Sequence, residues 1–296
     1  MQSIELKKRS SNNKEQSRGL DANKVKLIAL LSMTIDHIAV YGFEKEFIWN
    51  YYSIIRCIGR IAAPLFLLML IESINHCQNL LRFALRIYLA AVFTGTVYAI
   101  TNYYNGGING IYMPGNILFS YFYVIILSSL YSGAISVKGI KRFCYLVALI
   151  TIVYFPKVLF DAVVQHHLGL SESFVINYPQ IFQLLDDLLH ALICPIQYVE
   201  YSWIFVLLGF FLYISPSKYV QICVFSLFSL LSFCGYTFQW NIPYCAGFFS
   251  KAQFMMILAI PIYIVYNGNR GQQNKAFFYL YYPIHQTVLR LLFACF

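Results

Sequence analysis

The stretch LIALLSMTIDHIAVYGF, residues 27–43, is apolar enough to lie in a membrane except at one place, where Asp36 and His37 are adjacent. Ionisable side chains are expensive in hydrocarbon, so within a membrane they face other helices or a water-filled cavity. The stretch therefore predicts a helix inside a membrane bundle, with a functional site on its inward side.

The composition supports a membrane environment along the whole chain. Of the 296 residues, 59% are hydrophobic and only 11% are charged, and apolar blocks recur throughout. A spanning helix needs about 20 mostly apolar residues. This criterion predicts an all-α, polytopic integral membrane helix bundle with about nine transmembrane helices. They are expected near residues 25–43, 52–74, 83–101, 116–135, 143–160, 200–214, 219–238, 251–266 and 276–296.

Two segments differ from these apolar blocks. Residues 1–24 are polar and basic without an apolar centre, which predicts a disordered cytoplasmic tail before a transmembrane domain over 25–296. Residues 183–200 place leucines at helical spacing beside Asp186 and Asp187, which predicts an amphipathic helix lying in the membrane interface. His190 and the two aspartates resemble a metal-binding set, but they lie in an outer loop and no metal is predicted.

The basic residues predict the orientation. Lys and Arg are enriched in cytoplasmic loops. With the N-terminus inside, most of the 21 Lys and Arg residues fall on the inner side. The net charge of +9 is then a signal of topology, and nucleic acid is not a predicted partner.

Polar residues of three predicted helices share one depth. At 1.5 Å per residue, His37 lies about 18 Å above the inner end of its helix, and His285 about 14 Å up the last helix. Arg56 and Arg60 lie about 6 and 12 Å below the outer end of theirs, on one helix face. Asp36 and His37 point about 100° apart, so we expect Asp36 to neutralise an arginine while His37 faces a cavity.

Several blocks resemble one family. VKLIALLSMTIDHIAVYGF, IIRCIGRIAAPLFLLMLIES with HCQNLLRFALRIYL, NILFS, YNGNRG and FFYLYYPIHQTVL are together similar to the TraX-like family of bacterial membrane proteins. The resemblance covers nearly everything after residue 24. In the weaker match VEYSWIFVLLGFFLY, the family usually carries an aspartate and a glycine where this chain has Glu200 and Ser202.

The resemblance implies an activity. The family contains the enzyme that N-acetylates F-type pilin, and it is distantly similar to a lysosomal acetyltransferase that uses cytosolic acetyl-CoA on heparan sulphate glucosamine. It therefore implies a multi-pass enzyme of the bacterial cytoplasmic (inner) membrane with acetyl-CoA as co-substrate. The acceptor would be an amine, such as the N-terminus of a pilin-like protein, or a surface glycan.

The residues themselves suit acyl transfer. A neutral imidazole is a base near physiological pH, so His37 is the candidate general base or transient acyl carrier. Arg56 and Arg60 either stabilise the oxyanion of the intermediate or only balance the charge of Asp36. His285 follows a proline that can kink the helix, which suits a place in a wet site.

The donor would be bound on the cytoplasmic side. YNGNRG offers a turn with free backbone amides, and nearby arginines can pair with phosphates. The alternative is a simple turn that follows the positive-inside rule. The candidate CoA-binding residues are Arg82, Arg86, Asn267, Gly268, Arg270 and Gly271.

Two other functions remain open. A transporter or flippase would use the same buried charges to bind a substrate that itself crosses, although the sequence shows no inverted repeat. A non-catalytic factor of pilus or envelope assembly would use them for packing alone. Consumption of acetyl-CoA distinguishes the enzyme from both.

Overall fold

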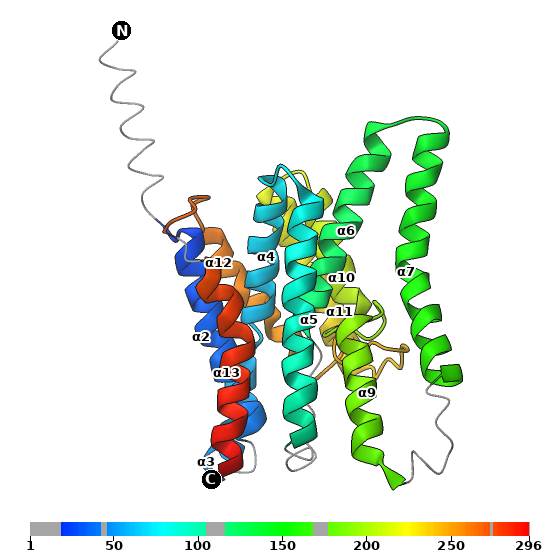
Figure 1. Cartoon of the computed structure of the whole chain (residues 1–296). Helices are drawn as coiled ribbons and strands as arrows, with labels where there is room; N and C mark the ends of the chain where they lie inside the picture. Colours follow the sequence, from blue (N-terminus) through cyan, green and yellow to red (C-terminus); the bar gives the residue numbers. More distant parts are fainter. Residues whose placement is uncertain (1–18, 43–45, 105–115, 168–176, 273–274, 296) are drawn as a thin grey trace.

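Every regular element in the described part of the chain is a helix, as the sequence predicts, and the helices form one bundle (Figure 1). The predicted tail, residues 1–24, falls mostly outside the described residues. The computed structural model describes residues 19–42, 46–104, 116–167, 177–272 and 275–295.

The helix α2, Ala22–Tyr41, carries both polar residues of the opening stretch. Asp21 caps its start, because Asp21 Oδ1 accepts a hydrogen bond from the Lys24 amide at 2.9 Å. Gly42 follows its last turn and its N–H donates to the Ile38 carbonyl. α2 packs against its sequence neighbours in the bundle and also against the last helix of the chain.

The predicted helix over 52–74 is broken into α3, Glu46–Gly59, and α4, Ala62–Asn75. Pro64 gives the reason. Proline has no N–H for the carbonyl of residue 60, and its ring displaces that carbonyl. Arg60 consequently lies in a turn between two helices rather than on a regular helix face.

Three long helices follow: α5, Leu80–Tyr104, α6, Ile117–Ser136, and α7, Ile140–His167. α6 packs against both of the others. Only 6% of the span over 140–163 is buried, so most of α7 faces away from the bundle. Its apolar surface suits contact with lipid.

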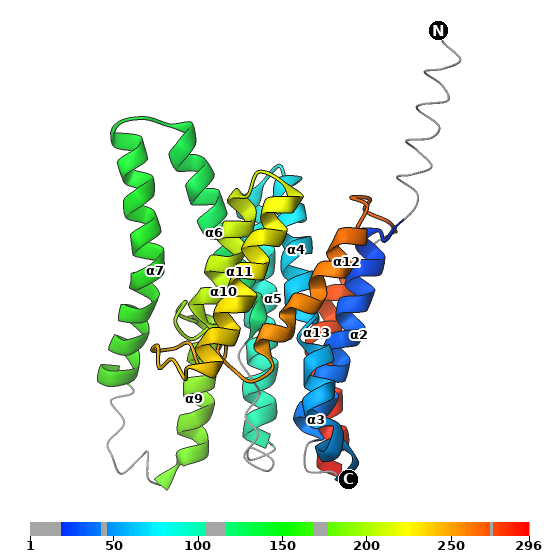
Figure 2. The ribbon, with the colours of Figure 1, turned by 180° about the vertical axis from the view of Figure 1, so that it is seen from behind.

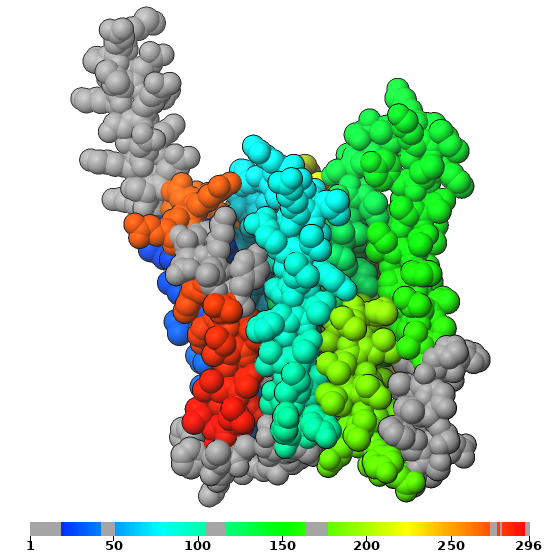
Figure 3. Space-filling model, in the orientation of Figure 1, coloured from blue at the N-terminus to red at the C-terminus, as the bar shows by residue number. Residues whose placement is uncertain are grey.

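The predicted interfacial helix exists as α9, Pro179–Leu192, but it packs along α5. Figure 3 shows α13, α5 and α9 side by side on one face of the molecule. After an irregular segment over 193–201, α10, Ser202–Ile214, continues toward the same end as α4 (Figure 1). The amphipathic pattern predicts the helix, whereas its direction follows from its packing along α5.

The last part of the chain contains α11, Lys218–Thr237, and α13, Lys275–Cys295, with a broken helix between them. That helix consists of the 3₁₀ turn η2, Gln253–Leu258, and α12, Ala259–Val265. Pro261 lies in the first turn of α12, where its missing N–H costs nothing. α11 and η2 pack together on the face seen in Figure 2.

The number of spans differs from the prediction. Only five segments among the described residues are long and apolar enough to cross a membrane, so the predicted number of about nine is wrong. α10 has 13 residues and α12 has seven, which is too short. α2 and α13 are long enough but carry buried polar residues. The five are 51–75, 80–104, 117–136, 140–163 and 218–237.

Most of the basic residues in the described part of the chain lie at one end of the bundle, which we call the basic end. It comprises the start of α2, the α4–α5, α6–α7 and α10–α11 connections and the loop after α12 (Figure 1). Lys218 ties two of these parts together, because its Nζ donates to the carbonyls of Ile264 and Tyr266 at 3.0 and 2.9 Å.

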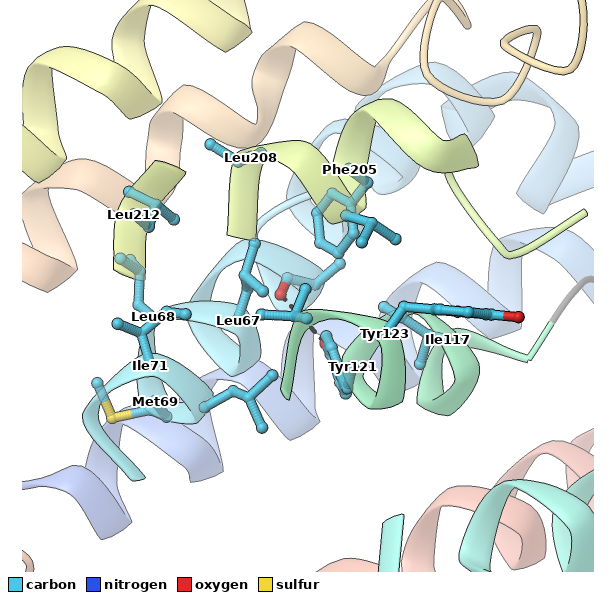
Figure 4. Packing of buried hydrophobic residues seen from close by; sticks show 14 of the residues in the cluster. Leu67, Leu68, Met69, Ile71, Ile117, Tyr121, Tyr123, Phe205, Leu208 and Leu212 are labelled. Atoms are coloured by element: carbon cyan, nitrogen blue, oxygen red, sulfur yellow. Dashed lines mark hydrogen bonds between the residues drawn. The ribbon is translucent and has the colours of Figure 1, made fainter. Parts of the chain in front are cut away.

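The hydrophobic core lies between α4, α6 and α10 (Figure 4). Leu67, Phe205 and Leu208 are fully buried there. Tyr121 extends into this core and donates its hydroxyl to the Ala63 carbonyl at 3.2 Å. The packing fixes α4 and α10 relative to α6, and both lead to the polar residues described next.

Candidate functional site

A cavity of 780 Å³ runs from the basic end into the bundle. Arg86, Gly268 and Arg270 line its open end and are exposed. Asp36 and His37 line its inner end and are buried. The 15 residues of α2 between Ala22 and His37 give this path a length of about 22 Å. The predicted cavity therefore exists, and it connects the basic loop with the polar pair.

Asp36 forms ion pairs with both Arg56 and Arg60. Its Oδ2 accepts hydrogen bonds from Arg56 Nη1 at 2.7 Å and from Arg60 Nη2. Asp36 and Arg60 are each 5% exposed, so this is a buried ion-pair cluster. Gly59 permits it, since a Cβ there would lie 2.1 Å from Asp36 Oδ1. Asp36 thus neutralises arginine charge, as the sequence predicts.

The arginines themselves do not reach the cavity. Arg60 Nη1 also donates to Tyr201 Oη at 3.2 Å and to Gln253 Oε1 at 3.1 Å. Neither Arg56 nor Arg60 is among the described residues that line the cavity. Of the two roles left open by the sequence, this geometry favours charge balance over oxyanion binding.

His37 and His285 form a directed hydrogen-bond chain. His285 Nδ1 lies 2.7 Å from the Tyr281 carbonyl, which can only accept, so this nitrogen carries the proton. In a neutral ring His285 Nε2 is then an acceptor, and His37 Nδ1, 2.7 Å away, must donate to it. The chain assigns the lone pair of His37 to Nε2.

The basic nitrogen of His37 has its own neighbour. Gln286 Nε2 lies 3.2 Å from His37 Nε2 and is placed to donate to it. Tyr41 donates to Gln286 Oε1 at 3.4 Å. Of the two histidines only His37 lines the cavity, so the structure gives His285 the orienting place behind it.

The loop over 266–271 is held at the basic end by the chain that precedes α2. Leu20 N donates to the Val265 carbonyl at 3.1 Å, and Asn267 N donates to the Leu20 carbonyl at 3.0 Å. Burial raises the pKa of Tyr266 to about 12, so its hydroxyl stays neutral beside the open end. The pairing holds Arg270 on the rim of the cavity.

The predicted CoA-binding residues divide into two groups. Arg86, Gly268, Arg270 and Gly271 line the cavity. Arg82 and Asn267 are not among the described residues that do. The Arg82 amide is bonded to Asn79 Oδ1.

The structure also adds residues that the predicted site lacked. Glu200 and Tyr201 line the inner end of the cavity, and Lys26 lines the path to it. Gln253 and Gln286 bond directly to Arg60 and His37. Of these residues, the sequence could have indicated only Glu200, because a single acid beside an apolar helix is unusual. Glutamines carry no charge, and one tyrosine cannot be singled out among 25.

The acidic residues and the histidine of α9 do not form a metal site. Among the described residues, no group of three or more His, Cys, Asp or Glu side chains is close enough to hold a metal ion. Asp187 instead accepts a hydrogen bond from Asn102 Nδ2 at 3.0 Å, and the His190 ring packs edge-on against Phe160.

Comparison with known proteins identifies the family. The family model described as TraX protein matches residues 21–165 and 187–293. Comparison with curated proteins and with solved structures gives no match. The matched residues include both ends of the cavity and the polar pair at its inner end. Because the match covers most of its length, the chain belongs to the TraX family.

Proposed function

We propose that the protein is an integral membrane acetyltransferase of the bacterial inner membrane, which moves an acetyl group from cytosolic acetyl-CoA to an acceptor amine. Membership of the TraX family supports a membrane protein associated with pili, so the acceptor would be the N-terminus of a pilin-like protein. The observation that carries the proposal is the continuous cavity from the basic loop to His37.

The cavity matches the distribution of charge in acetyl-CoA. The nucleotide end of CoA carries the phosphates, and Lys26, Arg86 and Arg270 lie at or near the open end. The thin, uncharged pantetheine arm would follow the path between α2 and α4, past Met33 and Phe66. Charge-assisted hydrogen bonds hold phosphate well, and the uncharged arm needs no counter-ion.

In this proposal His37 is the catalytic residue. Its Nε2 lone pair can take the proton of an attacking amine, which is general-base catalysis. His285 holds the ring in the required tautomer through Nδ1. Asp36 is paired with the two arginines, so we assign the general base to the imidazole of His37. In this arrangement the amine takes the place that Gln286 holds on Nε2.

The orientation is part of the proposal. We place the basic end in the cytoplasm, since acetyl-CoA is cytosolic and basic loops are retained there. Reporter fusions after Lys138 and after Asn241 should then give the cytoplasmic and the outer side, respectively. A common side for both reporters, or the reverse result, would contradict this placement.

The decisive experiment uses the full-length protein in lipid vesicles with acetyl-CoA labelled in the acetyl group. The wild type should acetylate an amine, and His37→Gln should lower the rate by about 10²- to 10⁴-fold, because glutamine cannot accept the proton. His190→Gln is the matched control, as His190 is outside the cavity. Absence of turnover in the wild type would refute the transferase, and an active His37→Gln variant would remove His37 from catalysis.

A further inference from the structure

The cavity contains a second acid, which differs from Asp36 in having no direct ion pair among the described residues. Glu200 and Asp36 both line the inner end. Asp36 is paired with two arginines. Among the residues that the structure describes, Glu200 has no Lys, Arg or His nitrogen within the 4.0 Å of an ion pair.

The backbone holds Glu200 in place at a cost in strain. The Glu200 carbonyl accepts from Ser120 Oγ at 2.9 Å, and Ser202 N donates to the Val199 carbonyl at 3.0 Å. The next two residues, Tyr201 and Ser202, have φ values of 61° and 72°, in the left-handed region. Non-glycine residues held in that region cost about 1 to 3 kcal/mol each and cluster at functional sites.

Glu200 has a cationic neighbour, Arg60, whose charge acts on it, and neutral hydrogen-bonding neighbours besides. Its carboxyl interacts with the Tyr201 hydroxyl and with the Ile117 amide. Its charge also acts on Tyr121 and Tyr282, which line the same end of the cavity. Arg60 already donates hydrogen bonds to Asp36, Tyr201 and Gln253, so the Glu200 carboxylate keeps acceptor capacity for an ammonium group that enters the cavity.

We propose that Glu200 binds the ammonium group of the acceptor and takes its first proton. This inference rests on the proposed function and adds a residue for the acceptor. An amino terminus is largely protonated at neutral pH and cannot attack a thioester in that form. Glu200 supplies a base for the first proton, and His37 then takes the second proton from the reacting nitrogen.

The ammonium gives a proton to the Glu200 carboxylate, and the free amine forms a C–N bond to the thioester carbon while the carbonyl electrons move to oxygen. The nitrogen gives its next proton to His37 Nε2. The carbonyl re-forms, the C–S bond breaks, and the CoA thiolate takes the proton from His37. Glu200 returns its proton to water, which yields the amide, CoA and one proton.

The test compares two acceptors on the full-length protein with acetyl-CoA. Alaninamide is largely an ammonium at neutral pH, whereas methoxyamine is uncharged. Glu200→Gln keeps the shape and the hydrogen-bonding capacity but removes the charge. We expect the ratio of kcat/KM for alaninamide to that for methoxyamine to fall about 10- to 100-fold, the range of a lost charge-assisted contact.

Two further variants complete the design. Glu200→Asp retains a carboxylate and should restore most of the preference for alaninamide. Asp187→Asn removes a carboxylate outside the cavity and should leave the ratio as in the wild type. An unchanged ratio in Glu200→Gln, or an equal loss with both acceptors, would overturn the role of Glu200. A wild type that uses neither acceptor would instead refute the proposed function, and this inference with it.

Discussion

His37 Nδ1 lies 2.7 Å from His285 Nε2, although 248 residues separate the two histidines along the chain. Their rings are stacked, with centroids 4.9 Å apart. Only His37 faces the cavity. The Tyr281 carbonyl therefore orients the ring of His285, and His285 in turn orients the ring of His37.

This arrangement predicts that replacing His37 and replacing His285 lower the rate of acetyl transfer by different amounts. His285→Gln should lower kcat about 10- to 100-fold with little change in the KM for acetyl-CoA. The reason is that the variant leaves the general base His37 in place but removes the histidine that orients its ring. His37→Gln should cost more. The double variant should be no worse than His37→Gln alone, since both act through one nitrogen. Losses that multiply in the double variant would show that His285 acts independently.

Gly59 gives a prediction about the stability of the ion-pair cluster. In Gly59→Ala the new Cβ would lie 2.1 Å from Asp36 Oδ1 and 2.3 Å from Asp36 Cβ, so α2 and α3 must separate. Overpacking of this kind costs about 1 to 3 kcal/mol. Gly247→Ala is the control, since its Cβ would have ordinary contacts at 3.7 Å and beyond. The Tm in detergent should fall for Gly59→Ala only, and equal Tm values would contradict the close approach.

Arg270 tests the donor end. Arg270→Ala should raise the KM for acetyl-CoA with little change in kcat, because a phosphate contact far from the thioester contributes uniform binding. A charge-assisted contact of about 1.5 to 3 kcal/mol corresponds to about a 10- to 150-fold rise. Lys141→Ala removes an exposed charge at the same end outside the cavity and serves as control. If both variants behave alike, the loop is only a topology signal.

Ser202 tests the strained turn. At φ 72° a serine costs about 1 to 2 kcal/mol that glycine does not. Ser202→Gly also loses the bond from the Ile204 amide to Ser202 Oγ at 3.2 Å, but replacing such a cap by glycine costs only a few tenths. The relief of backbone strain is larger than the loss of this hydrogen bond, so Ser202→Gly should unfold at a higher temperature than the wild type. Ser226→Gly, inside α11, should unfold at a lower one, and a lower Tm for Ser202→Gly would refute the strain.

Glycine at this position is also what the family resemblance implies, which links the sequence to the geometry. The left-handed φ of Ser202 explains why glycine would be favoured there. The same φ value shows that this chain forms the turn with a serine in place of glycine. The physical reason is that Ser202 is 3% exposed and bonded on both sides, so its surroundings determine its conformation.

The sequence alone determined the environment and the central residues. Hydropathy indicated a helical membrane protein, and the cost of ionisable groups in lipid singled out Asp36, His37, Arg56 and Arg60. The basic residues predicted which loops share an end, because charge near a helix end is a local property. The number of spans was overestimated, since a window of composition cannot recognise a helix shortened like α10 or the short helix formed by η2 and α12.

The tertiary structure decided which of these residues meet and what each one faces. Whether Arg60 turns to Asp36 or to the cavity depends on the helix break before Pro64, which no periodic pattern encodes. The partners of His37 depend on how α2 and α13 are rotated about their own axes, and that rotation follows from packing along their whole length. Glu200 and Tyr201 line the site for a similar reason, because the turn that carries them is held against α6 by the hydrogen bond from Ser120 Oγ to the Glu200 carbonyl.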